Sequence, residues 1–99
     1  MRFEWDAAKN EANIRKHRID FADVPEVFKG PVYLARDTRK EYGEDRWGGI
    51  GFLGNGVVVV VYVERAQDTI RIISARKAEK HERETFQKEI EHRLGLSGE

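Results

Sequence analysis

Residues 57–63 read VVVVVYV, and this unbroken apolar run limits the possible folds more than any other segment of the chain. Side chains of a β-strand alternate between the two faces of a sheet, so a strand that is apolar throughout must be covered on both faces. The run is far shorter than the roughly 18 apolar residues that a membrane-spanning helix needs. We therefore expect it to be the central strand of a sheet inside a globular domain.

Four further segments are expected to form strands around the central one. They are residues 2–5, 32–37, 44–53 and 69–76. The GNG sequence at 54–56 is a strong hairpin signal and would connect residues 44–53 to the central strand. Gly48, Gly49 and Gly51 interrupt that segment, and such glycines indicate a bulge or a close approach of other backbone.

The first helix is expected to begin after Asp6, a good N-cap residue, and to run to about His17. Helical spacing predicts that its inward stripe consists of Ala7, Asn10, Ile14 and His17. A histidine in such a stripe is more often a structural residue than a catalytic one.

Two more helices are expected. Asp20 can cap a short one, in which Pro25 would delay the start or bend the helix. Its apolar face would consist of Phe21, Val24 and Phe28. The other runs from about Ala78 to Leu94, and Gly95 can end it. The order β-α-α-β-β-β-β-α predicts a single α+β domain over residues 1–99, with a mostly antiparallel sheet that packs its helices on one side.

Composition excludes several classes of protein. The chain has no cysteine, which excludes disulfides and thiolate metal sites, and its N-terminus has no apolar signal segment, so we expect a cytoplasmic location without membrane attachment. Lysine plus arginine and aspartate plus glutamate each number 18, which argues against binding nucleic acid by bulk charge. Residues 65–83 nevertheless hold six basic against three acidic residues. Such a patch is either a specific phosphate-handling site or a solvated charged face.

The last strand and the last helix hold the strongest candidate pair. Positions 78, 82, 86, 90 and 94 form one line on the helix, and all but Glu82 are apolar. A carboxylate on a core-facing line needs a partner, and we expect this partner to be Arg76. Strict strand alternation places Arg76 with Ile72 and directs Arg71 to the opposite face. The pair would either fix the helix to the sheet or place an acid or base beside a phosphate-binding arginine.

Other motifs are weaker. Glu44 and Arg46 would share a strand face, and Arg65 ends the central strand, where side chains can line a site on the sheet. His81 and His92 are expected to be exposed. No histidines have the spacing of metal ligands and no glycine-rich loop has the lysine of a P-loop, so we predict no metal and no nucleotide cofactor.

Several segments together resemble the BrnT family of toxins from type II toxin–antitoxin systems. They are FEWD at 3–6, Lys9, NIRKH at 13–17, Phe21, VF at 27–28, GEDR at 43–46, VVVYVER at 59–65 and RIISARKA at 71–78 with Glu82. The likeness covers residues 3 to about 86 and leaves 87–99 as the end of a helix and a tail. Phe86 stands where the family often has tyrosine, and Pro25 departs from its uninterrupted helix.

The resemblance implies a RelE-like fold and a ribonuclease that halts translation. It also implies neutralisation by a BrnA-type antitoxin with a DNA-binding domain, in a dimer or a heterotetramer. Metal-free RNA cleavage needs a base for the 2′-hydroxyl proton, a cation for the phosphate charge and an acid for the leaving 5′-oxygen.

For these roles we expect Arg65 and Arg76 to grip the phosphate, with Glu82 as proton acceptor or orienter and His17 as a reserve acid. Flanking phosphates would contact Arg46, Arg71, Lys77 and Lys80. One alternative is a non-catalytic module that binds RNA or a protein through the basic last strand. Another is a purely structural subunit.

Overall fold

The computed structural model describes residues 1–37 and 43–95 of the chain. Its elements are β1 (Arg2–Glu4), α1 (Ala7–His17), the 3₁₀ helix η1 (Phe21–Lys29), β2 (Val32–Arg36), β3 (Trp47–Leu53), β4 (Gly56–Arg65), β5 (Thr69–Lys77) and α2 (Lys80–Arg93). This order confirms the predicted α+β arrangement. The second helix takes the tighter 3₁₀ form, with Pro25 inside it. Proline has no N–H to donate, so the segment cannot hold an uninterrupted α-helical ladder there.

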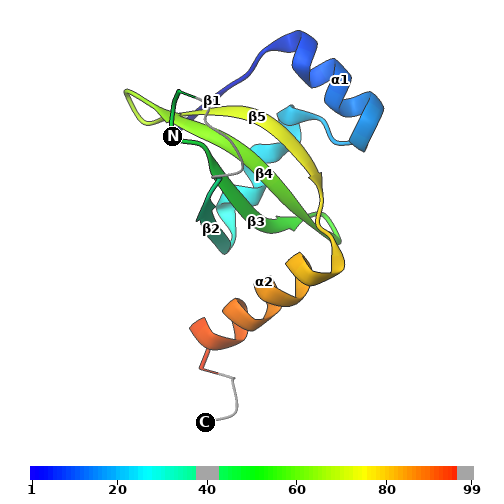
Figure 1. Cartoon of the computed structure of the whole chain (residues 1–99), viewed down its shortest axis with the longest axis vertical. Coiled ribbons are helices and arrows are strands. Elements are labelled where there is room, and N and C mark those ends of the chain that lie inside the picture. Colours follow the sequence, from blue (N-terminus) through cyan, green and yellow to red (C-terminus); the bar gives the residue numbers. More distant parts are fainter. Residues whose placement is uncertain (38–42, 96–99) are drawn as a thin grey trace.

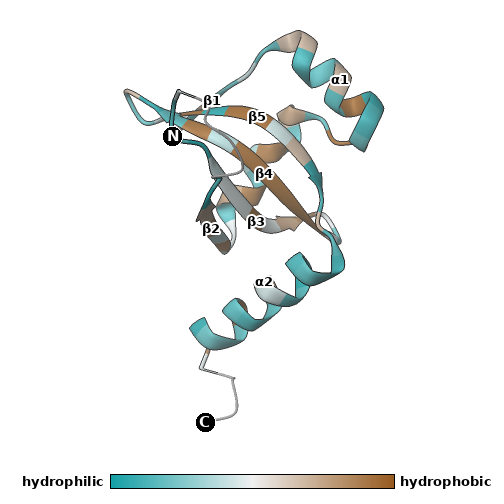
Figure 2. Ribbon diagram, viewed as in Figure 1, coloured by the Kyte–Doolittle hydropathy of each residue, from teal (hydrophilic) through white to brown (hydrophobic). Residues whose placement is uncertain are grey.

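One five-stranded sheet organises the molecule, in the order β1-β5-β4-β3-β2 (Figure 1). The β1–β5 pair is parallel, and the other three pairs are antiparallel. Residues Val58 to Val63 of β4 are all buried, which confirms the central strand. Figure 2 shows β4 as apolar along most of its length. The polar sequence TRKEYG at 38–43 predicts a turn between β2 and β3, but it lies almost wholly outside the described residues.

Glycines in β3 let η1 approach the sheet closely. A Cβ atom at Gly51 would lie 2.7 Å from Cγ1 of Val27 in η1, and one at Gly49 would lie 3.0 Å from Cγ1 of Val32. A Cβ atom at Gly51 would also lie 3.3 Å from the carbonyl oxygen of Pro31, so the predicted close approach of other backbone is confirmed at this position. Gly54 has a φ of 60° in the turn between β3 and β4, as the GNG hairpin signal requires.

Replacing Gly51 with alanine should lower the free energy of unfolding by about 1–3 kcal/mol, because the added methyl group overpacks the contact with Val27. Urea denaturation measures this loss. Gly30→Ala is the matched control, since a Cβ atom there meets nothing within 4 Å, and it should change stability by less than about 0.5 kcal/mol. Equal stability of the two variants would contradict this account of the β3 glycines.

Helix α1 covers the edge of β5 that β1 leaves open (Figure 1). Asn13 is buried and makes two hydrogen bonds to Ala75, donating to its carbonyl oxygen at 2.9 Å and accepting from its N–H at 3.2 Å. Its amide also donates to the carbonyl oxygen of Ile19. The side chain thus satisfies backbone groups of an unpaired strand edge. The predicted inward stripe is wrong in this respect, because Asn13 is the buried residue of α1, whereas Ala7 is exposed.

A bulge in β5 changes which face its later residues occupy. Tyr62 of β4 pairs with Ile72, but its neighbour Val61 pairs with Ser74, so Ile73 is the extra residue. Beyond the bulge Arg76 pairs with Val59, on the face opposite the main core. The expectation that Arg76 shares a face with Ile72 is therefore wrong.

Arg71 lies on this same face, opposite the main core, which we call the second face of the sheet. It pairs with Val63, which lies two residues from Val61 on β4, so the side chains of both arginines project from one side of the sheet. Strict alternation along β5 predicted that Arg71 and Arg76 lie on opposite faces of the sheet. The extra residue Ile73 reverses the alternation after it, so both arginines lie on the same face.

Helix α2 lies on the second face, away from α1 and η1. Phe86 is buried and packs edge-on against Phe52 of β3, with ring centroids 5.0 Å apart. The expectation that all helices pack on one side is therefore wrong for α2. Leu94, the last member of the predicted docking line, is 65% exposed, while Gly95 ends the helix with a φ of 69°. Within residues 1–37 and 43–95, every helix is too short or too polar to cross a bilayer.

Candidate functional site

An ion pair joins the end of β5 to the start of α2. The two terminal nitrogens of Arg76 donate to the two carboxylate oxygens of Glu82, at 2.8 and 2.7 Å. One of these oxygens also accepts the backbone N–H of Glu79, the N-cap residue of α2, at 2.8 Å. The expected partnership of Arg76 and Glu82 is confirmed. It fixes the plane of the guanidinium and stabilises the first turn of the helix.

These contacts make Glu82 a strong acid. Hydrogen bonds from Arg76 are the largest cause of a pKa of about 2, against an ordinary value of 4.5, and they outweigh the opposing effect of burial. The backbone N–H of Glu79 lowers the pKa further. A carboxylate with so low a pKa is ionised at neutral pH and is a poor proton acceptor. Of the two predicted roles for Glu82, the geometry therefore favours orienting Arg76.

The lowered pKa of Glu82 makes stability depend on pH. Because the folded-state pKa is depressed, the contribution is fully present above about pH 4.5 and is lost as pH falls toward 2. We expect Glu82→Gln to be less stable than the wild type by about 2 kcal/mol at pH 6, with the difference shrinking steadily between pH 4.5 and 2. Urea denaturation across this range measures it. Parallel stability curves for the two proteins would show that the pair does not stabilise the fold.

A basic groove opens on one side of Arg76. It is lined by Lys16, His17, Arg18, Arg76, Lys77 and Glu79. The groove forms because Asn13 binds the edge of β5 and so brings the last turn of α1 beside the end of that strand. Five of the six lining side chains are cationic or can become so, and a concave surface of one charge sign attracts anions such as phosphate.

His17 is the histidine that lines this groove. Burial is the first cause of a pKa below the ordinary value of 6.5, and the charges of Lys16 and Arg76 lower it further. The imidazole is therefore neutral at pH 7 and able to accept a proton. Sequence reasoning placed His17 on the inward stripe, whereas in the structure it lines an open groove.

A second hollow lies on the other side of Arg76, over the second face of the sheet. Its lining residues are Tyr33, Ala35, Arg36, Asp37, Gly48, Ile50, Val59, Val61, Arg76 and Glu82. The cavity has a volume of about 210 Å³. Arg76 is 32% exposed and borders both hollows, so a ligand in either one can approach its guanidinium.

The structure separates Arg65 from this site. Arg65 pairs with Thr69 and Arg76 pairs with Val59, six residues away along β4, a separation of about 20 Å. The predicted grip of Arg65 and Arg76 on one phosphate is therefore wrong. Arg65 instead forms an ion pair with Glu44 at 3.4 Å.

The predicted phosphate contacts fall into two groups. Arg46 and Arg71 lie toward the Arg65 end of the sheet, where Arg46 approaches Glu44 to 3.8 Å and Arg71 pairs with Glu4 at 2.9 Å. Lys77 lines the basic groove, whereas Lys80 lines a separate hollow over Phe86.

Sequence reasoning did not select several residues that the fold brings to Arg76. These are Lys16, Arg18, Tyr33 and Asp37. The basic run at 15–18 was the available signal for the first two, since charges of one sign cluster there around a histidine. No local pattern marks Tyr33, because strand pairing alone brings β2 to the site.

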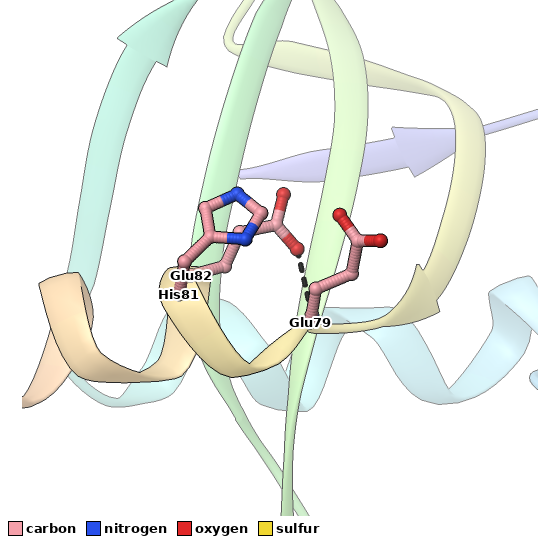
Figure 3. A group of neighbouring side chains, drawn as sticks. All are labelled: Glu79, His81 and Glu82. Atoms are coloured by element: carbon pink, nitrogen blue, oxygen red, sulfur yellow. Dashed lines mark hydrogen bonds between the residues drawn. The ribbon is translucent and has the colours of Figure 1, made fainter.

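Three side chains at the start of α2 have the chemistry of metal ligands. Ligand atoms of Glu79, His81 and Glu82 lie within 4.8 Å of one another, and Figure 3 shows the three side chains side by side on the first turn of the helix. Both oxygens of Glu82 already accept hydrogen bonds from Arg76. The other two residues are exposed, and two exposed ligands make a weak site. The absence of metal stays a prediction.

Comparisons with known proteins bear directly on this arrangement. A family model described as "Ribonuclease toxin, BrnT, of type II toxin-antitoxin system" matches residues 5–82. The crystal structure of the Brucella abortus ribonuclease toxin BrnT superimposes with a TM-score of 0.66 at 29% sequence identity, covering 81% of this chain and 99% of that one. A comparison with curated protein sequences finds no match.

Proposed function

This chain belongs to the BrnT family of ribonuclease toxins of type II toxin–antitoxin systems. From this we propose that it is an endoribonuclease, that its active site is centred on Arg76, and that cleavage of RNA there needs no metal ion. The observation that carries the proposal is the fixed guanidinium of Arg76 at the junction of two open hollows. A guanidinium whose plane is fixed by a carboxylate keeps its positive charge in place, so it needs no reorganisation when charge develops on the phosphate oxygens.

The residues around Arg76 suit attack by the 2′-hydroxyl on the neighbouring phosphorus. Neutral His17 takes the 2′-hydroxyl proton while the 2′-oxygen bonds to phosphorus. Arg76 stabilises the charge on the phosphate oxygens. The bond from phosphorus to the 5′-oxygen then breaks, and the leaving oxygen takes a proton from an ammonium group of the basic groove, Lys16 or Lys77. The products are a 2′,3′-cyclic phosphate and a free 5′-hydroxyl.

An assay in EDTA tests this function. The purified protein is incubated with single-stranded RNA and with the same strand carrying 2′-deoxyribose throughout. We expect discrete fragments from RNA alone: at each cut the upstream fragment ends in a 2′,3′-cyclic phosphate and the downstream fragment begins with a 5′-hydroxyl. Cleavage that requires an added divalent ion would reject the metal-free mechanism. A gel shift with uncut RNA would favour the non-catalytic binding module instead.

The toxin activity is expected to act on translation in the cytoplasm and to be blocked by a BrnA-type antitoxin. Both expectations rest on the family and on the proposed cleavage. Inducing the chain alone should arrest growth and lower the rate of protein synthesis, and co-expression of a BrnA-type antitoxin should restore both. Arrest with unchanged protein synthesis would contradict translation as the target.

A further inference from the structure

We propose that the 210 Å³ hollow beside Arg76 binds one nucleobase of the RNA, next to the phosphate that this arginine holds. The inference rests on the proposed function and adds a subsite to it. Pockets for drug-sized ligands measure about 300–1,000 Å³. This hollow is smaller, and its size suits a single ring system.

Strand pairing builds the floor of the hollow from three neighbouring strands. Ile50 of β3 pairs with Val59 of β4, which in turn pairs with Arg76 of β5. Their side chains therefore share one face, and the two apolar side chains form a floor that ends at the guanidinium. Because Arg76 is only one strand, about 4.8 Å, from this floor, one nucleotide can place its phosphate at Arg76 and its base over Val59.

Small residues open the hollow on the side away from Arg76. Ala35 of β2 pairs with Gly48 of β3, and both lie on the second face of the sheet. The absence of larger side chains at these two positions leaves room above the floor. Tyr33, two residues before Ala35 and paired with Ile50, adds an aromatic ring to the lining. Aromatic side chains beside apolar floors are platforms on which bases stack in single-stranded nucleic acids.

The rim of the hollow carries donors and acceptors at both ends. Arg36 and Asp37 lie at one end, and Arg76 and Glu82 at the other. Each base edge presents both donors and acceptors, so a polar rim of mixed character suits a base. An aliphatic side chain of a protein partner has no donor or acceptor to offer this rim. A base is therefore the better match.

Binding of a single-stranded RNA that cannot be cut tests the subsite. The probe is a fluorescent 2′-O-methyl oligonucleotide, compared with the same strand carrying abasic positions. Ala35→Trp fills the hollow without removing a charge, and Leu34→Trp adds the same bulk to the adjacent position on the other face of β2, where Leu34 is 51% exposed. Tyr33→Ser removes the ring, so that the result does not depend on one variant.

We expect Ala35→Trp and Tyr33→Ser to weaken binding of the oligonucleotide by about 10-fold or more, as loss of base stacking does, and Leu34→Trp to leave it unchanged. Abasic strands should bind all four proteins alike. Wild-type affinity in both pocket variants would overturn the subsite. So would loss of antitoxin binding in Ala35→Trp with unchanged RNA binding, since the hollow would then hold a protein side chain.

The same proteins separate this inference from the function on which it rests. If the wild type binds the 2′-O-methyl strand through the hollow but leaves the ribose strand intact, the cleavage proposal fails and the base subsite stands. If the wild type cuts RNA and both pocket variants cut it at the same rate and positions, the cleavage proposal stands and the subsite fails.

Discussion

Replacing Arg76 with alanine should lower the rate constant of RNA cleavage by about 10²–10³-fold, because this guanidinium is the proposed donor to the developing phosphate charge. Arg76→Lys keeps the charge but loses the planar group that Glu82 orients, and we expect it to recover only a small part of the rate. Single-turnover cleavage of a labelled RNA, with enzyme in excess, measures the chemical step apart from product release.

The Arg76 variants also remove the partner of Glu82, so a lower rate could reflect a displaced helix α2. The double variant Arg76→Ala/Glu82→Gln separates these effects, because it leaves no unpaired carboxylate. It should unfold at a higher urea concentration than Arg76→Ala and remain equally inactive. Arg65→Ala is the matched control on the same sheet face, about 20 Å away, and should cut RNA at nearly the wild-type rate. A large defect in Arg65→Ala with an active Arg76→Ala would place the reaction at the other end of the sheet.

Local patterns in the sequence were sufficient to predict the elements of the fold. The run at 57–63 identified the central strand because only a strand covered on both faces tolerates seven apolar residues. Asp6 and Asp20 identified the starts of α1 and η1, and both carboxylates do accept a backbone N–H there. These features depend on residues only a few positions apart.

Features that depend on distant pairings were not predictable in this way. The extra residue in β5 has no composition signal, since Ile73 is as suited to a regular strand as Ile72. It nevertheless decides that Arg76 shares its face with Val59. Asn13 was overlooked for a related reason: its burial compensates an unpaired strand edge 62 residues later in the chain.

The candidate site shows the same division. Glu82 could be paired with Arg76 from sequence, because a carboxylate on an apolar helix line needs a nearby cation. The prediction that Arg65 and Arg76 bind one phosphate was wrong. The position of Arg65 at a strand end does not indicate which end of the neighbouring strand lies beside it. His17 lies beside Arg76 because the hydrogen bonds of Asn13 to Ala75 hold helix α1 against the end of β5.

The pair of Arg76 and Glu82 has two roles that a single variant cannot separate. It holds the first turn of α2 against the sheet, and it orients the guanidinium that is proposed to stabilise charge on the phosphate. This geometry, with a pKa of about 2 for the carboxyl group, serves both roles, because the ion pair stays formed across the neutral range. Proton transfer must then come from another residue, and the groove that Arg76 borders offers His17, whose pKa is lowered by burial and by the charges of Lys16 and Arg76.

Replacing His17 with glutamine should lower the rate constant of cleavage by about 10²–10⁴-fold, as expected for loss of a general base.

The pH dependence gives a sharper test. Burial and the charges of Lys16 and Arg76 lower the pKa of His17, so the wild-type rate should rise with pH with its midpoint below the ordinary histidine value of 6.5. The residual activity of His17→Gln should lack this rise. His92→Gln, an exposed change in the last turn of α2, should keep both rate and profile. A His17→Gln protein that retains the wild-type rate and its acid limb would exclude His17 as the base and assign the proton transfer to solvent or to a lysine of the groove.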